Sequence, residues 1–337
     1  MKRVGFLIDK IADIDNLRFS FYKAQTGQQG KRDVIKYREN LQSNLELLRQ
    51  QILFKNIKVG NYQLFKIFDP KERTVCAASF NERVLHHAII NICGEYFERH
   101  FISTTYANRK NKGVYKALDL AHFATSHYRF VAKLDVRKYF DSIDHYVLKF
   151  LLRRLFKDKC LLYLLDQIID SYHVEENKGL PIGNLTSQYF ANYYLSGLDH
   201  YVKEVLLVPI YIRYMDDILL FGNDLDLLKE QVRKVTLYVC ENLRLQLKIP
   251  IIQKTIKPFT FLGYSFCENK ITLAKRSRFR FEEKYYRMLK MFDRGLWTED
   301  ELQSHLLPLF AFVRYAYTKK YRETIINRVE NRRGLIE

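Results

Sequence analysis

The segment YIRYMDDILLF at residues 211–221 gives the strongest indication of the fold. It contains two short runs of aromatic and aliphatic residues joined at Met215 and Asp216, which predicts two strands connected as a tight hairpin. Asp216 and Asp217 are adjacent carboxylates at the predicted tip, and like charges this close raise each other's pKa unless a cation neutralises them. The pair is typical either of a cation-binding hairpin or of an ordinary Asp-rich turn between strands.

A further carboxylate lies upstream in an apolar segment. Residues 130–136 read FVAKLDV and predict a buried strand that carries Lys133 and Asp135. A charged carboxylate there is costly unless it is compensated. Lys133 and Arg137 would share the strand face of Asp135, so a salt bridge to either is one explanation. Bound Mg²⁺ is the other, because this ion prefers oxygen ligands and is commonly held by one or two carboxylates together with substrate phosphates.

The segments around these carboxylates predict an α+β fold. From residue 130 the expected order is strand, helix, helix, hairpin, helix, strand, which favours a small antiparallel sheet with helices packed on one face. Thr298 and Glu301 form a capping box that opens another helix. The remaining expected elements are helices at 41–52, 83–101, from about 142, 185–206 and from 223 or 224 to 243, and a strand at 259–266.

The composition indicates a nucleic-acid partner. The formal net charge is +18, and a protein with this imbalance usually carries it to meet a polyanion. The alternative is a generally basic protein whose lysines only solvate it. The 24 Tyr and 24 Phe favour the first explanation, because aromatic faces among basic residues are suited to stacking on bases. Residues 275–294 contain eight basic and three acidic side chains, which predicts a separate basic helical module.

Cysteine spacing and hydropathy indicate the compartment. The five cysteines are scattered without a CxxC pair, so we expect free thiols in a reducing compartment. No run approaches the roughly 18 apolar residues that a membrane span needs, and the apolar stretch near the N-terminus is too short for a signal peptide. We therefore expect a cytoplasmic protein with no membrane partner.

Three motifs, taken in order, resemble those of reverse transcriptases. YMDD at 214–217 looks like the signature hairpin of that family, and FLGY at 261–264, with Phe261, Leu262 and Gly263, is similar to its primer grip. Asp135, with Phe140 five residues later, is similar to the first metal-binding motif, where the aromatic ring excludes a ribose 2′-hydroxyl.

The resemblance implies an RNA-directed DNA polymerase with a right-hand fold and a two-metal mechanism. It implies fingers at 1–129, a palm at 130–268 interrupted by an inserted fingers segment, and a basic helical thumb at 269–337. Asp135, Asp216 and Asp217 would be the catalytic residues. The same three carboxylates, together with Val136, would hold two Mg²⁺ ions. The substrates would be dNTPs, a primer nucleic acid and a template RNA.

A narrower resemblance lies in LPIGNLTSQ at 180–188. Most reverse transcriptases have Gln where this chain has Ile182, and tend to have Pro where it has Gln188. The form found here is similar to the reverse transcriptases of diversity-generating retroelements, and DPKER at 69–73 and HHA at 86–88 fit the same group. Such enzymes copy a template-repeat RNA with frequent errors at adenines, and the cDNA rewrites a variable gene in mutagenic retrohoming. They work with a small basic protein, the accessory variability determinant.

The resemblance also implies roles for several further side chains. Phe140, Ile182 and Gln188 would line the nucleotide site, and Ile182 cannot hydrogen-bond around the nucleotide as Gln can, so that a mispair loses less relative to a correct pair. The alternative for Ile182 is packing at a Pro-Gly turn. Lys71 and Arg73 would hold the triphosphate, since a bidentate Arg suits phosphate geometry; the alternative is a solvated surface charge. Less defined assignments are template contacts by Arg109, Lys110 and Lys112, for which plain surface charge is equally favoured, and a general acid at Lys248 or Lys254.

Two kinds of rival function remain. The first is another bacterial reverse transcriptase, from a retron or a group II intron. Retrons usually keep Gln at the position of Ile182, and we expect the short stretch after the thumb to count against an intron enzyme. The second is a non-catalytic RNA-binding protein that has kept the fold, which the presence of the three aspartates and Phe140 disfavours.

Overall fold

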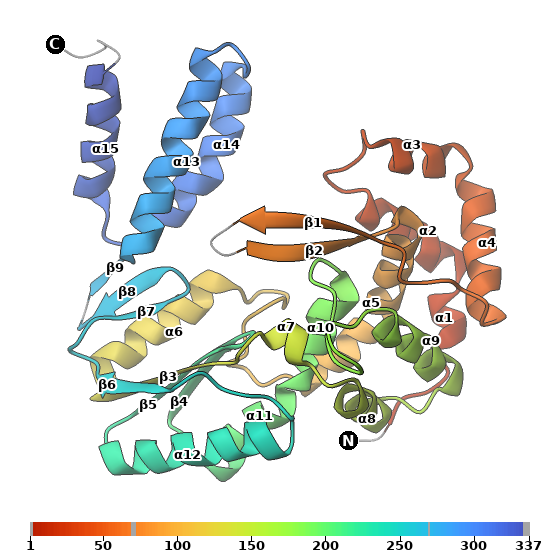
Figure 1. Cartoon of the computed structure of the whole chain (residues 1–337), viewed down its shortest axis with the longest axis horizontal. Coiled ribbons are helices and arrows are strands. Elements are labelled where there is room, and N and C mark those ends of the chain that lie inside the picture. The colour runs from red at the N-terminus through yellow and green to blue at the C-terminus, as the bar shows by residue number, and fades with distance from the viewer. Residues whose placement is uncertain (1–2, 69–71, 269, 333–337) are drawn as a thin grey trace.

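The predicted hairpin belongs to a four-stranded antiparallel sheet in the order β4-β5-β3-β6 (Figure 1). This computed structural model describes residues 3–68, 72–268 and 270–332. The predicted hairpin is present, with β4 and β5 joined by the two residues Met215 and Asp216, and the predicted α+β fold with an antiparallel sheet and packed helices is confirmed. The strands of this sheet are β3 (Phe130–Asp135), β4 (Ile210–Tyr214), β5 (Asp217–Gly222) and β6 (Ile251–Lys254).

Helices cover both faces of this sheet, so the expectation of helices on one face is wrong. Ile218 and Leu220 of β5 pack toward α12 (Leu225–Glu241), whereas Leu219 and Phe221 pack in a second core with α6 (Val114–His127). Figure 1 shows α6 and α12 on opposite sides of the strands. The reason is visible in the strand itself, because an uninterrupted apolar run has no polar face to leave in water.

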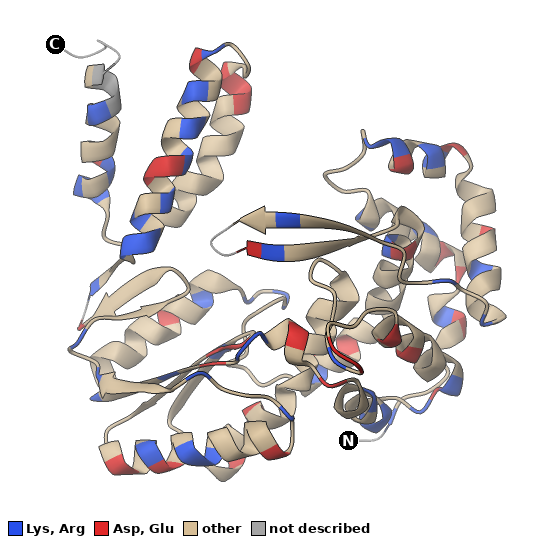
Figure 2. Ribbon diagram, in the orientation of Figure 1, with Lys and Arg blue, Asp and Glu red and all other residues tan. Residues whose placement is uncertain are grey.

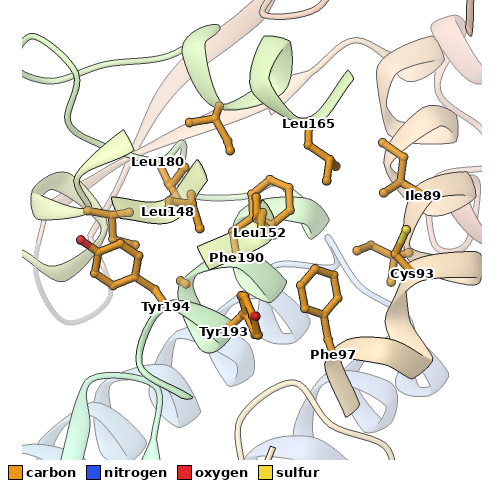
Figure 3. Packing of buried hydrophobic residues seen from close by; sticks show 14 of the residues in the cluster. Ile89, Cys93, Phe97, Leu148, Leu152, Leu165, Leu180, Phe190, Tyr193 and Tyr194 are labelled. Atoms are coloured by element: carbon orange, nitrogen blue, oxygen red, sulfur yellow. The ribbon is translucent and has the colours of Figure 1, made fainter. Parts of the chain in front are cut away.

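The N-terminal region is helical and carries a two-stranded ribbon. Its central helix is α5, which confirms the helix predicted at 83–101, and Figure 3 shows Ile89, Cys93 and Phe97 of α5 facing Phe190 and Tyr193 of α10. Sequence patterns did not predict the antiparallel ribbon β1–β2. The elements are α1 (Ile8–Ile11), α2 (Ile14–Ala24), α3 (Arg32–Glu39), α4 (Leu41–Leu53), β1 (Tyr62–Phe68), β2 (Glu72–Ala78) and α5 (Phe80–His100).

The segment between β3 and β4 is broken into short helices. The single helix predicted at 185–206 is interrupted at Leu195, between α10 and α11. Gly197 lies within α11, where a Cβ atom would lie 2.8 Å from the Tyr238 hydroxyl of α12. The helix expected from about residue 142 begins instead after Asp144, whose carboxylate accepts a hydrogen bond from the Val147 N–H at 2.9 Å. The elements are α7 (Tyr139–Ser142), α8 (His145–Leu155), α9 (Lys159–Asp170), α10 (Leu185–Tyr194), α11 (Ser196–His200) and the π-helical turn Tyr201–Val205.

The C-terminal region begins with a second small sheet and ends in three helices. The strand predicted at 259–266 is a hairpin, because Leu262 and Gly263 have φ of +48° and +88°, as a tight turn between antiparallel strands requires. The predicted capping box of Thr298 and Glu301 is present. Figure 2 shows Lys and Arg spread along α13. The elements are β7 (Phe259–Phe261), β8 (Tyr264–Cys267), β9 (Lys270–Leu273), α13 (Lys275–Asp293), α14 (Glu299–Arg314) and α15 (Lys319–Arg332).

Two predictions from composition concern cysteines and membranes. The five cysteines form no disulfide among the residues described, as expected from their spacing. Within the same ranges, none of the helices combines the length and apolar character needed to cross a membrane.

Candidate active site

Three aspartates meet at one end of the four-stranded sheet. Asp217 is the first residue of β5 and lies directly opposite Asp135, the last residue of β3. Directly opposite residues of antiparallel strands have Cβ atoms about 4.5–5.5 Å apart and side chains on the same face. Asp216 occupies the hairpin turn next to Met215, which has φ of +53°. Antiparallel pairing therefore brings together carboxylates that are 82 positions apart in the chain.

The electrostatics of this end of the sheet are unfavourable for anions. The pKa of Asp216 is raised to about 6, first by burial and then by the charges of Asp217 and Asp135, while Lys248 acts in the opposite direction. A carboxyl group with a pKa raised in this way binds a proton or a cation more readily than one in water. The site is therefore arranged to receive positive charge.

Asp135 forms its ion pair with Lys248. The Lys248 ammonium lies 2.7 Å from both carboxylate oxygens of Asp135, and its backbone N–H donates to the Asp135 carbonyl at 2.8 Å. The predicted alternative of a salt bridge to Lys133 is wrong, since the Lys133 ammonium donates to the Thr260 carbonyl at 2.7 Å. Lys254, the other candidate general acid, pairs with Phe130 at the far end of β3, about 16 Å away along the strand.

A fully buried ion pair is hydrogen-bonded to the turn of the β4–β5 hairpin. Arg213 in β4 and Asp199 in α11 are both inaccessible to solvent, and two guanidinium nitrogens of Arg213 each donate to Asp199 oxygens at 2.6 Å. A third donates to the Met215 carbonyl at 3.2 Å and to the Asn192 side chain at 2.9 Å. Because Met215 precedes Asp216, this network fixes the turn that presents the carboxylate.

This network was not predicted from the sequence, although a signal for it was available. An Arg within an apolar strand is almost never buried without a partner, so Arg213 alone indicated a buried acid elsewhere. The sequence did not identify Asp199 as that acid, because Asp199 lies in a helical segment and its other partners belong to other parts of the chain. These are the hydroxyl groups of Tyr211 and Thr105, which donate to Asp199 at 2.7 and 2.8 Å.

The loop that contains Ile182 connects the Phe140 segment to the ribbon. The Leu180 N–H donates to the Phe140 carbonyl, and the Cys76 N–H of β2 donates to the Ile182 carbonyl, both at 2.8 Å. Gly183 has φ of +114°, and a Cβ atom there would lie 2.9 Å from Val75, so the close approach of β2 requires glycine. The 180–183 loop is therefore hydrogen-bonded to Phe140 on one side and to β2 on the other.

The other predicted nucleotide-site residues are less closely connected to the aspartates. Gln188 is half-buried in α10, and Arg73 is exposed on β2, opposite Ile67. Lys71 lies outside the described residues. Arg109 is engaged within the protein, since its guanidinium pairs with Glu98 at 2.9 Å and donates to the Thr105 carbonyl at 2.9 Å, which disfavours the predicted template contact.

The predicted primer-grip residues form the turn between β7 and β8. Phe261 is buried, while Leu262 and Gly263 line a cavity of about 570 Å³ between this turn and α13 and α14. A Cβ atom on Gly263 would lie 3.0 Å from the Ser277 hydroxyl. The turn is therefore packed against the base of the C-terminal helices.

The carboxylate oxygens of this site are ligands of the kind that a hard divalent cation prefers. In the described ranges, no group of three or more His, Cys, Asp or Glu side chains is arranged to hold a metal ion. Mg²⁺ takes one or two carboxylates with waters and substrate phosphates, and Asp135 and Asp216 offer such oxygens where a cation is electrostatically favoured. Val136 follows Asp135 and bridges to Leu247 in the segment that carries Lys248.

Comparisons with known proteins bear on this geometry. The family model described as "Reverse transcriptase (RNA-dependent DNA polymerase)" matches residues 68–266. Protein YkfC of Escherichia coli (strain K12) is 24% identical over 285 residues, covering 70% of this chain and 72% of that protein.

Two solved structures of apo telomerase from Candida tropicalis are also similar. The one truncated from the C-terminal domain has a TM-score of 0.46 at 13% identity, covering 64% of this chain and 55% of its own. The other has a TM-score of 0.47 at 11% identity, covering 65% of this chain and 49% of its own. The chain thus spans about half the length of these telomerase chains.

Proposed function

The chain belongs to the reverse transcriptase (RNA-dependent DNA polymerase) family, and on that premise we propose that it makes the error-prone cDNA of a diversity-generating retroelement. The observation that supports polymerase chemistry most strongly is the meeting of Asp135, Asp216 and Asp217 at one sheet end, where burial and mutual repulsion raise the pKa of Asp216. The retroelement assignment is supported by the Ile182 loop, which lies beside the Phe140 segment.

In the proposed reaction, the 3′-oxygen of a primer attacks the α-phosphorus of a dNTP. A new P–O bond forms, the bond from that phosphorus to the bridging β-phosphate oxygen breaks as pyrophosphate leaves, and the proton of the 3′-hydroxyl passes to solvent water. Asp135 and Asp216, with Asp217 and the Val136 carbonyl, would hold two Mg²⁺ ions. When bound, these ions would favour ionisation of the 3′-hydroxyl and stabilise charge on the leaving group.

The division of labour along the chain follows from the same proposal. We assign the fingers to residues 1–129, the palm with its inserted segment to 130–268, and the thumb to 269–337. The basic side chains along α13 suit contacts with a nucleic-acid backbone. We further propose template-repeat RNA as the template and a basic accessory variability determinant as a protein partner, both supported by the resemblance of the 180–188 motif.

The deoxyribose selectivity of the enzyme is expected to depend on Phe140. Replacing Phe140 with alanine removes the ring that would meet a 2′-hydroxyl, so the preference for dNTPs over rNTPs should fall about 10- to 100-fold. The measurement compares kcat/KM for dATP and rATP in primer extension. Phe150→Ala is the matched control, because Phe150 is 61% exposed on α8 and should leave selectivity unchanged. Equal selectivity in both variants would contradict the assignment.

The error spectrum is expected to depend on Ile182. In the Ile182→Gln variant a correctly placed nucleotide gains a hydrogen bond that a mispair does not, so misincorporation opposite template adenines should fall about fivefold, as one net hydrogen bond would give. The measurement is sequencing of cDNA copied from one RNA by both proteins. Ile256→Gln, at an exposed position, serves as the control. An unaltered spectrum would show that Ile182 only packs the turn.

The wild-type spectrum tests the retroelement assignment itself. Substitutions concentrated opposite template adenines are expected, with the cognate RNA and candidate accessory protein added in separate reactions. A faithful product would keep the polymerase but favour a retron-like or intron-like enzyme.

A further inference from the structure

Tyr315 lies where the C-terminal helices meet the rest of the molecule. It directly follows α14, and its hydroxyl donates to the Asp119 carboxylate of α6 at 2.5 Å and to the Tyr115 carbonyl at 3.3 Å. Tyr115 and Asp119 are four positions apart, so they share one face of α6. A single hydroxyl group therefore joins the end of α14 to the first two turns of a helix that lies 196 positions earlier in the chain.

Two further tyrosine rings pack against the ring of Tyr315. The centroid of the Tyr115 ring lies 4.9 Å away, and that of the Tyr264 ring lies 5.5 Å away at an interplanar angle of 74°, an edge-to-face arrangement. Tyr264 directly follows Gly263 of the β7–β8 turn, and its hydroxyl donates to the Phe312 carbonyl of α14 at 2.7 Å. Tyr315 thus contacts both α6 and the first residue of β8.

The start of α6 is bonded to the strand that leads into the β4–β5 hairpin. The Gly113 N–H, immediately before α6, donates to the Tyr106 carbonyl at 3.0 Å, and the Tyr106 N–H donates to the Arg213 carbonyl of β4 at 2.9 Å. The Arg213 guanidinium donates in turn to the Met215 carbonyl of the hairpin turn. The position of the C-terminal helices relative to Asp216 is therefore determined in part through α6.

The C-terminal helices extend far from this contact. α14 has 16 residues and is about 24 Å long at 1.5 Å per residue. α13 packs on it, with the rings of Phe281 and Phe310 5.5 Å apart, so the two helices move together. Figure 2 shows basic side chains along the length of α13. A small rotation at Tyr315 would therefore displace the far ends of these helices, with their charges, much more than it displaces their base.

The hydrogen bond between Tyr315 and Asp119 is accessible to water. Asp119 is exposed, the Tyr115 side chain is 44% exposed, and Tyr315 is half-buried. Burial, and then the hydrogen bond to Asp119, hold the pKa of the Tyr315 hydroxyl well above its usual value, so this group remains a proton donor. Because water competes for both partners, the bond contributes only modestly to folding. It can therefore break without unfolding the helices that it joins.

Building on the proposed function, we propose that Tyr315 is a positioning residue: its hydrogen bond to Asp119 is a latch that holds the C-terminal helices over the primer–template duplex and sets how long the duplex stays bound. When the latch is closed, the basic side chains of α13 stay within reach of the duplex backbone. When it opens, the helices move away and the duplex dissociates. Nucleotide addition at Asp135 and Asp216 does not involve the latch, so its rate on bound duplex should not change.

The test compares Tyr315→Phe with Tyr321→Phe in the full chain. Tyr315→Phe keeps the ring contacts and removes only the hydroxyl. Tyr321→Phe is the matched control, because the Tyr321 hydroxyl donates to the Arg278 carbonyl at 3.1 Å and to the Glu282 carboxylate at 2.9 Å, and so joins α15 to α13 rather than to α6. The dissociation rate of a labelled DNA primer–RNA template duplex is measured without dNTP after excess unlabelled duplex is added. It should be about fivefold higher in Tyr315→Phe, as the loss of one net hydrogen bond gives, and unchanged in Tyr321→Phe.

Variants of the acceptor locate the effect. Asp119→Ala should reproduce the faster dissociation, whereas Asp119→Asn, whose amide oxygen can still accept the bond, should stay close to wild type. The combination of Tyr315→Phe with Asp119→Ala should release the duplex no faster than either change alone, because both remove the same bond. Effects that multiply in the combined variant would show that the two side chains act separately, which contradicts the latch.

Primer extension gives the second measurement. With excess unlabelled duplex present to capture dissociated enzyme, Tyr315→Phe should make shorter products than wild type, while its single-turnover rate of adding one dNTP equals that of wild type. An unchanged dissociation rate in Tyr315→Phe, or an equal increase in Tyr321→Phe, overturns the latch. Duplex dissociation that depends on Tyr315 and Asp119 in a protein unable to extend primers would refute the proposed function and keep the latch.

Discussion

Replacing Asp216 with asparagine is expected to lower RNA-templated dNTP incorporation by about a thousandfold or more. The substitution removes a negative oxygen from the point where a divalent ion would be held, and several kcal/mol of transition-state stabilisation depend on such an ion. The measurement is single-turnover extension of a labelled primer. Asp226→Asn on α12 is the control, because the Asp226 side chain is 90% exposed and remote from the site. Activity within tenfold of wild type would remove Asp216 from the catalytic set.

The same substitution is expected to stabilise the metal-free protein at pH 8. The pKa of Asp216 is raised to about 6 by burial and by Asp217, so the ionised carboxylate destabilises the folded state above that pH. Asparagine removes this penalty, which is about 3 kcal/mol for a shift of this size. The gain should shrink as the pH falls through 6 and vanish below about 4, where Asp216 is protonated in both states. Urea unfolding in EDTA at pH 8 and pH 4 measures it, and a loss of stability at pH 8 would contradict the electrostatic account.

Breaking the buried ion pair is expected to have the largest effect on folding. In Arg213→Met, Asp199 is left charged and inaccessible to solvent, which costs about 3–5 kcal/mol. Removing both charges in Arg213→Met with Asp199→Leu should recover much of this loss, because the uncompensated charge disappears with the second substitution. Denaturant unfolding of the three proteins gives the free energies.

The control for this pair is Arg153→Met, which breaks a more exposed ion pair with Asp166 and should cost less than about 1 kcal/mol. A cost below 1 kcal/mol for Arg213→Met would show that the network does not support the hairpin. A double variant that folds stably but extends primers poorly would show that the ion pair has two roles. It would position Met215 and Asp216 for activity in addition to stabilising the fold.

Local patterns predicted the elements whose signals lie within a few residues. The β4–β5 hairpin, the helix at 83–101 and the capping box of Thr298 each depend on neighbours in the chain, and each is present. The ribbon β1–β2 was missed because its exposed apolar residues show no alternation that marks a buried face. The hairpin at 259–266 was read as one strand because the turn residue Leu262 gives no sign of a positive φ.

The candidate site was predictable in its residues and unpredictable in its connections. The order of the motifs predicted that Asp135 and the 216–217 pair belong together, and antiparallel pairing places them so. The partner of Asp135 is Lys248, 113 positions downstream, and the partner of Arg213 is Asp199, on a different element. Periodicity within a strand or helix carries no information on contacts of this kind, which tertiary packing alone determines.

Polymerase activity at the three aspartates is decided by extension of a DNA primer on an RNA template with Mg²⁺ and dNTPs, using wild type beside Asp216→Asn. We expect template-directed DNA product from wild type, its loss in the variant, and its loss in EDTA. Product that persists in Asp216→Asn, or a folded wild-type protein that makes none even with cognate RNA and accessory protein, would contradict it.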